Sequence, residues 1–106
     1  EDILRGGDGD DILHGGADDD LLTGNAGEDY FVLTPGTGKD TITDFALGED
    51  SIVLQDGLSL SDLQIQSLGS DTEIQANGQA IAILEGVDAN IFVQQIDTAI
   101  TDNLGI

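Results

Sequence analysis

The feature that most constrains this chain is a nine-residue period in its first third. An aspartate followed by two apolar residues recurs at that interval in four places: Asp2-Ile3-Leu4, Asp11-Ile12-Leu13, Asp20-Leu21-Leu22 and Asp29-Tyr30-Phe31. In three of these triplets the aspartate is also the last residue of a glycine-rich segment of six residues: Gly6–Asp11, Gly15–Asp20 and Gly24–Asp29. Each unit is therefore predicted to be a turn followed by a short strand. A linker of similar composition would be flexible and solvated, but it has no reason to keep such a period.

The strands of this repeat are predicted to stack. Alternation along a strand places Leu4, Leu13, Leu22 and Phe31 on one face. A single unit cannot bury that face alone, so neighbouring units must cover one another. Two units make one coil, and residues eighteen apart are then expected to lie directly above one another.

The turns suit a hard cation. Glycine tolerates positive φ, so a glycine-rich turn can direct several carbonyl oxygens at one point, and its last Asp adds a carboxylate. Turns one coil apart could hold an ion between carbonyls and two Asp side chains, which is the all-oxygen environment that Ca²⁺ prefers. The chain has no Cys and a single His, so disulfides and soft-metal sites are excluded.

The charge excludes several classes of partner. Asp and Glu number 22 against 2 Lys and Arg, giving a formal charge of −20. Such a chain repels nucleic acid and anionic lipid and resists compaction unless counter-charge is bound. Neither a membrane-spanning segment nor a signal-peptide pattern at the first residues is visible. Because Glu1-Asp2-Ile3-Leu4 matches the second half of later units, we expect the sequence to be part of a longer protein.

The repeat resembles the glycine-rich calcium-binding nonapeptide of RTX proteins. Gly6 to Leu13 fits that pattern fully, whereas Ala17, Asp18 and Asn25 depart from it. The resemblance implies an all-β protein: a right-handed parallel β-roll over residues 1–40, closed by a strand-rich cap over residues 41–106.

The resemblance also implies ligands for two to three Ca²⁺ ions. One ion is expected among the carbonyls of two turns and their aspartates: Gly7, Gly9, Asp11, Gly24, Ala26 and Asp29. A second would use Gly16, Asp18, Asp20 and the following turn that ends at Asp40. A third would lie between Asp2 and the group Gly15, Ala17 and Asp20.

The segment Lys39–Leu54 resembles the one that follows the coil in RTX proteases. Strands are predicted around Ile42 and over Ile52–Leu54, and a further strand over Ile91–Gln95. Asn77-Gly78 predicts a two-residue hairpin between Thr72–Ala76 and Gln79–Leu84. Residues 59–63 are predicted to form a short helical turn or a loop. Asp44, Glu49 and Asp50 are read as turn-capping carboxylates, with a further ion as the alternative.

By this resemblance, the chain is expected to be a calcium-dependent folding module. It would be the C-terminal part of a type I-secreted, extracellular bacterial protein, monomeric, with calcium and the secretion apparatus as partners. The alternative is an RTX-like adhesin or a module that binds polysaccharide or a cell surface. No catalytic activity is expected: His14 is isolated, no nucleophile motif is visible, and the repeat assigns Asp11 and Asp20 to metal while Asp10 and Asp19 face solvent.

Overall fold

The computed structural model describes residues 3–14, 19–33, 38–46, 48–54, 60–76, 78–94 and 100–102. Its elements follow the chain as β1 (Ile3–Arg5), β2 (Ile12–His14), β3 (Leu21–Thr23), β4 (Tyr30–Leu33), β5 (Asp40–Ile42), β6 (Ser51–Leu54), a 3₁₀ helix (Leu60–Asp62), β7 (Leu63–Leu68), β8 (Asp71–Ala76), β9 (Gln79–Leu84), α1 (Ala89–Gln94) and β10 (Ile100–Asp102). Strands thus predominate, in agreement with the predicted all-β class.

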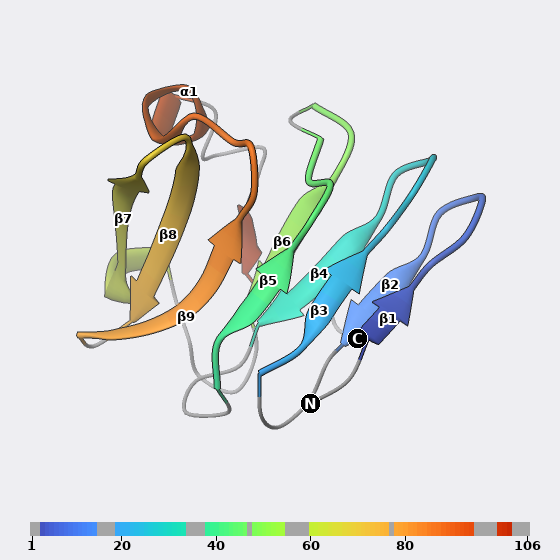
Figure 1. The fold of residues 1–106 in the computed structure, drawn as a ribbon, viewed down its shortest axis with the longest axis horizontal. Coiled ribbons are helices and arrows are strands. Elements are labelled where there is room, and N and C mark those ends of the chain that lie inside the picture. The colour runs from blue at the N-terminus through green and yellow to red at the C-terminus, as the bar shows by residue number, and fades with distance from the viewer. Residues whose placement is uncertain are drawn as a thin grey trace.

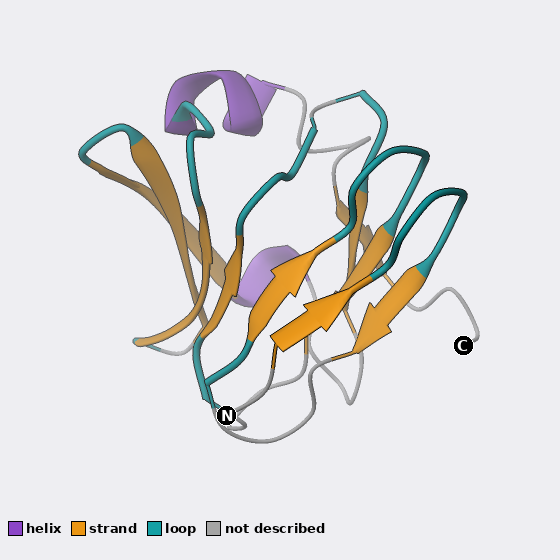
Figure 2. Ribbon diagram, turned by 45° about the vertical axis from the view of Figure 1, so that its right-hand side comes forward, coloured by secondary structure: helices purple, strands orange, loops and turns teal. Residues whose placement is uncertain are grey.

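Successive short strands alternate between two sheets (Figure 1). The six-stranded sheet has the order β1-β3-β5-β9-β8-β7, and the four-stranded sheet has the order β10-β6-β4-β2. Each turn therefore carries the chain from one sheet to the other. The turns that connect β1 to β2, β3 to β4 and β5 to β6 lie side by side (Figure 2).

The predicted spacing of eighteen residues is confirmed in the first two parallel pairs. Ile3 pairs with Leu21 between β1 and β3, and Ile12 pairs with Tyr30 between β2 and β4. The interval then lengthens, because Leu21 pairs with Thr41, twenty residues on, and Tyr30 pairs with Ser51, twenty-one residues on. The regular coil ends where this interval changes.

The cap continues the six-stranded sheet with a different strand direction. β9 is parallel to β5, whereas β8 pairs antiparallel with both β9 and β7, so the sheet is mixed. The hairpin predicted at Asn77-Gly78 is confirmed by the pairing of β8 with β9, and Gly78 has a φ of 80°. Asn77 itself lies outside the described residues.

The core lies between the two sheets. Leu13, Leu22 and Phe31 are 5% exposed or less, while their neighbours Ile3 and Ile12 are 65% and 56% exposed. The predicted inward face of the repeat is therefore confirmed. Phe45 links this core to the cap, with its ring centroid 6.0 Å from those of Phe31 and Phe92.

The strand predicted over Ile91–Gln95 is wrong, because residues 91–94 belong to α1; Gln95 lies outside the described residues. Asp88 begins the helix: its Oδ1 accepts hydrogen bonds from the backbone N–H groups of Asn90 at 2.8 Å and Ile91 at 3.2 Å. This N-cap outweighs the apolar run that suggested a strand. Neither α1 nor the 3₁₀ helix has the length or apolar character needed to cross a bilayer.

The fold predicts unequal roles for two neighbours in α1. Phe92 is fully buried and Val93 is 49% exposed. We expect Phe92→Ala to lower the free energy of unfolding by about 3–5 kcal/mol, and Val93→Ala to change it by no more than about 0.5 kcal/mol. Urea unfolding followed by circular dichroism measures both, and equal losses would contradict the packing of α1 onto the core.

Candidate metal centre

The aspartates that end the turns form ladders of hydrogen bonds between coils. The backbone N–H of Asp11 donates to Asp29 Oδ1 at 2.9 Å, and that of Asp29 donates to Asp50 Oδ1 at 3.0 Å. On the other side of the coil, the N–H of Asp20 donates to Asp40 Oδ1 at 3.2 Å. All of these carboxylates except that of Asp11 belong to residues that are 5% exposed or less.

The turns keep the same backbone shape at equivalent positions. Gly7 and Asn25, eighteen residues apart, have φ values of 81° and 65°, and Gly9 and Gly27 have values of 95° and 102°. Asn is one of the few residues besides Gly that adopts this left-handed region readily. The departure from the repeat at Asn25 therefore preserves the turn.

Two turn glycines leave room for the aspartate that closes the same turn. A Cβ atom on Gly6 would collide with the carboxylate of Asp11, and one on Gly24 would collide with the carboxylate of Asp29. A Cβ on Gly27 would collide with the carbonyl group of Gly9 in the preceding turn. The aspartates therefore fold back over their own turns, and successive turns are in direct contact.

Two carboxylate oxygens in these turns have an environment that suits a cation. Oδ2 of Asp11 and Oδ2 of Asp29 are buried and have no hydrogen-bond donor within the part of the chain that the structure describes. Buried polar atoms are nearly always satisfied, because leaving one without a partner costs free energy. A bound cation would satisfy both oxygens, so the residues present fit a hard metal ion.

The structure places all six residues of the first predicted site in two adjacent turns. Asp11 and Asp29 are joined by the ladder, and the Gly9 carbonyl lies against Gly27. Among the described residues, no three His, Asp or Glu side chains lie together as a metal-binding group. The predicted site requires only two carboxylates, with backbone carbonyls as its other ligands. The assignment of all six residues, Gly7, Gly9, Asp11, Gly24, Ala26 and Asp29, as calcium ligands stays a prediction.

The other two predicted sites are described only in part. The structure brings Asp20 and Asp40 together, as the second site requires. Five residues assigned to these sites lie outside the described residues: Asp2, Gly15, Gly16, Ala17 and Asp18.

Burial of the carboxylates shifts their protonation. Burial raises the pKa of Asp29 and of Asp50 above the ordinary value of an aspartate. Burial, together with the negative charge of Asp20, raises the pKa of Asp40 to about 7. The ladders thus concentrate negative charge where water does not stabilise it, which favours a counter-charge.

Two exposed aspartates, Asp10 and Asp19, accept hydrogen bonds from the following coil, a role that was not predicted from the sequence. Asp10 Oδ1 accepts from the N–H of Glu28, and Asp19 Oδ1 accepts from the N–H of Lys39, both at 2.8 Å. Asp10 and Asp19 are solvent-exposed as predicted, yet each one connects two turns. Their shared position, immediately before the closing aspartate, is the sequence signal that could have revealed this.

Asp44 and Asp50 act as turn-capping carboxylates, which was the favoured of the two interpretations. Asp50 Oδ2 accepts from the N–H of Ala46 at 2.9 Å, so both of its oxygens have donors. Asp44 Oδ1 accepts from the N–H of Gly24 at 2.9 Å, and its Oδ2 accepts from that of Asn25 at 2.7 Å. Both carboxylates are therefore satisfied by backbone amides.

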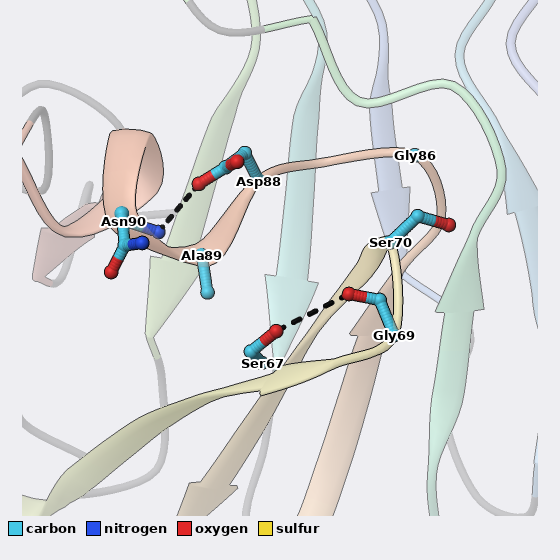
Figure 3. Close-up of a pocket in the computed structure, with 7 residues that line it drawn as sticks. All are labelled: Ser67, Gly69, Ser70, Gly86, Asp88, Ala89 and Asn90. Carbon is cyan, nitrogen blue, oxygen red and sulfur yellow. Dashed lines mark hydrogen bonds between the residues drawn. The ribbon is translucent and has the colours of Figure 1, made fainter.

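The cap contains a polar hollow of about 310 Å³ beside the start of α1 (Figure 3). Its carboxylate, that of Asp88, caps the helix, and the hydroxyl of Ser67 donates to the carbonyl of Gly69 at 3.3 Å. The polar groups of Asp88 and Ser67 thus stabilise the local fold. The glycine-rich turns that end at Asp11 and Asp29 remain the better candidate for a ligand site.

A comparison with protein families agrees with this site. The family model of the RTX calcium-binding nonapeptide repeat matches residues 1–31 in four copies. The segment that contains Asp11 and Asp29 is therefore an RTX-type calcium-binding repeat. No curated protein matches the chain.

Contact between turns predicts different effects for two glycine substitutions. Gly27 and Gly48 have φ values of 102° and 90°, so alanine at either position incurs backbone strain of about 1–2 kcal/mol. Only at Gly27 would the new Cβ also strike another turn, since Gly48 has open space. Gly27→Ala should therefore reduce the free energy of unfolding more than Gly48→Ala. Equal losses in urea unfolding would contradict the stacking of the two turns.

The raised pKa values predict a pH dependence in the metal-free chain. Asp29, Asp40 and Asp50 bind protons more tightly when folded than when unfolded, so folding takes up protons. Stability should fall as pH rises from the ordinary value of 3.8 through the value of about 7 at Asp40, and then level off. We expect the chelated chain to show more strand signal in far-ultraviolet circular dichroism at pH of about 5 than at about 8, and Asp40→Asn to weaken that dependence. Greater stability at the higher pH would contradict it.

Proposed function

We propose that this chain is a calcium-dependent folding module in which residues 1–40 form a right-handed parallel β-roll and residues 41–106 close it as a cap. The observation that carries the proposal is the pair of buried carboxylate oxygens, Asp11 Oδ2 and Asp29 Oδ2, that have no donor in the described structure. They lie in turns that match a calcium-binding repeat. Strand alternation between two sheets and the spacing of eighteen residues support the roll.

Each group would have a defined task in this site. Asp11 and Asp29 would supply carboxylate oxygens, while Gly7, Gly9, Gly24 and Ala26 would supply carbonyl oxygens. Asp20 and Asp40 would serve a second ion on the other side of the coil together with Gly16 and Asp18, and Asp2, Gly15 and Ala17 would serve a third with Asp20. Calcium when bound supplies counter-charge to these closely spaced carboxylates.

Folding and ion binding are expected to be one process. A chain with a charge of −20 resists compaction, and the proposed ligands come together only when the coils stack. Extracellular calcium modules bind with dissociation constants of about 10⁻⁴–10⁻³ M, so cytoplasmic calcium would leave such a module unfolded. An unfolded chain can be threaded through an exporter and then fold outside the cell.

The context of the module follows from the same repeat. RTX repeats are typical of secreted bacterial proteins. We therefore propose that the chain acts as a monomer at the C-terminal end of an extracellular bacterial protein that leaves the cell through a type I secretion apparatus. Its contribution to the parent protein would be ion binding and folding, without catalysis.

A calcium titration tests this function. We expect far-ultraviolet circular dichroism of the chelated chain to gain strand signal cooperatively with calcium and much less with magnesium, which resists the loss of its water ligands. Asp29→Asn and Asp11→Asn should each raise the calcium midpoint at least about tenfold, because each removes a charged ligand.

Glu85→Gln is the matched control. It removes one exposed negative charge directly after β9, at a residue that is not among the proposed ligands, and should leave the midpoint nearly unchanged. A chelated chain that is already folded and does not respond to calcium would refute the proposal, and a surface-binding module would then be the function to test.

A further inference from the structure

The carboxylate of Asp44 accepts hydrogen bonds from the start of the turn Gly24–Asp29, on the side opposite to the proposed ion. Its two oxygens accept hydrogen bonds from two successive backbone amides, those of Gly24 at 2.9 Å and Asn25 at 2.7 Å. Charge-assisted bonds of this kind are shorter and stronger than neutral ones. Successive amides in a turn that includes a left-handed residue, here Asn25 with a φ of 65°, form a concavity that favours an anion.

The position of Asp44 is itself well determined. Thr43, the residue before it, donates its N–H to the carbonyl of Leu22 at 3.0 Å, and its Oγ1 lies 2.6 Å from Oγ1 of Thr23. These contacts hold the chain after β5 beside the chain after β3. Asp44 therefore meets the start of the turn from a fixed place in the following coil.

These two hydrogen bonds to Asp44 set the direction of the Gly24 carbonyl. In a trans peptide unit the N–H and C=O bonds point in opposite directions. The unit between Thr23 and Gly24 shows the consequence, because its N–H donates to Asp44 while its carbonyl accepts from Gly6 N in the preceding coil at 2.8 Å. The next unit also donates its N–H, that of Asn25, to Asp44. Its carbonyl, that of Gly24, is thereby directed away from Asp44, toward the turn that contains Asp11.

Asp44 also adds fixed charge near the site. Its carboxylate lies against the first two residues of the turn that ends at Asp29. A carboxylate whose two oxygens already accept from amides does not compete for the ion. It strengthens the attraction for a cation at Asp11 and Asp29.

We propose that Asp44 is a positioning residue of the calcium site between the turns Gly6–Asp11 and Gly24–Asp29, directing the Gly24 carbonyl and adding charge without touching the ion. This inference rests on the proposed function. Groups that orient metal ligands typically contribute a factor of about 10–100 in affinity, and we expect Asp44→Asn to weaken calcium binding by at least the lower value.

Asp71→Asn provides a matched control. Asp71 Oδ1 also accepts a backbone hydrogen bond, from Gly86 N at 2.7 Å, but within the cap. Both variants remove one carboxylate charge and disturb an amide contact. The readout is the rate of calcium release from the loaded chain after addition of a chelator, together with the calcium midpoint. We expect Asp44→Asn to accelerate release about tenfold and Asp71→Asn to leave it within a factor of about two.

High salt separates orientation from charge. At about 1 M salt the screening length is about 3 Å, so a purely electrostatic effect of Asp44 should weaken. We expect most of the difference between the two variants to persist, because the direction of a carbonyl is not screened. Loss of the whole difference would overturn the positioning role.

A measurement on the unsubstituted chain covers the case in which Asp44→Asn fails to fold. In the calcium-loaded protein, nuclear magnetic resonance should detect coupling across the hydrogen bond from the Asn25 amide nitrogen to the Asp44 carboxyl carbon, and absence of this coupling would overturn the inference. If the unsubstituted chain binds calcium and the two variants release it equally fast, only this inference fails. If the unsubstituted chain binds no calcium, the proposed function fails as well.

Discussion

The rest of the structure depends on a hydrogen bond that a carboxylate accepts from the backbone of the preceding coil. It recurs from Asp11 to Asp29, from Asp29 to Asp50 and from Asp20 to Asp40. Each bond satisfies an amide at the point where a turn enters a strand, so it sets the height at which the next strand begins. Since every strand of the coil has only three or four residues, its few ladder bonds would hold the register weakly without this anchor.

The same bonds place negative charges where they are least stable. A carboxylate that accepts an amide hydrogen bond is buried by the turn above it, and its second oxygen is left to be satisfied by something else. For Asp50, in the turn between β5 and β6, the second oxygen accepts from the amide of Ala46. The Oδ2 atoms of Asp11 and Asp29 have no such donor among the described residues. The molecule therefore has two ways of completing equivalent turns, one from its own backbone and one that calls for a cation.

Local periodicity predicted the coil well because the inward face of each strand must be buried. Leu13, Leu22 and Phe31 could be assigned to the core from spacing alone, and so could the strand pairing of the first two coils. The closing aspartates of the candidate site followed from the same repeat. The bridging roles of Asp10 and Asp19 were missed although both residues stand immediately before a closing aspartate. The role of Asp44 could not be predicted, since it depends on the height of one coil above the next. Helix α1 was missed because its short apolar run suggested a strand and the capping role of Asp88 was not considered. Strand β7 was missed because Leu63 and Ile65 alternate with glutamines over only a few residues.

Alternation of strands between the two sheets has a consequence for how such a chain can change in length. A single nonapeptide inserted among the first strands would send every strand before it to the opposite sheet, where its second apolar residue would still face the core, because Leu13 and Leu22 are both buried although β2 and β3 belong to different sheets. A pair of nonapeptides would restore each strand to its own sheet and leave the cap undisturbed. The full coil is therefore the smallest insertion that keeps every strand in its own sheet, whereas a single unit keeps the inward face and changes only which sheet each preceding strand joins.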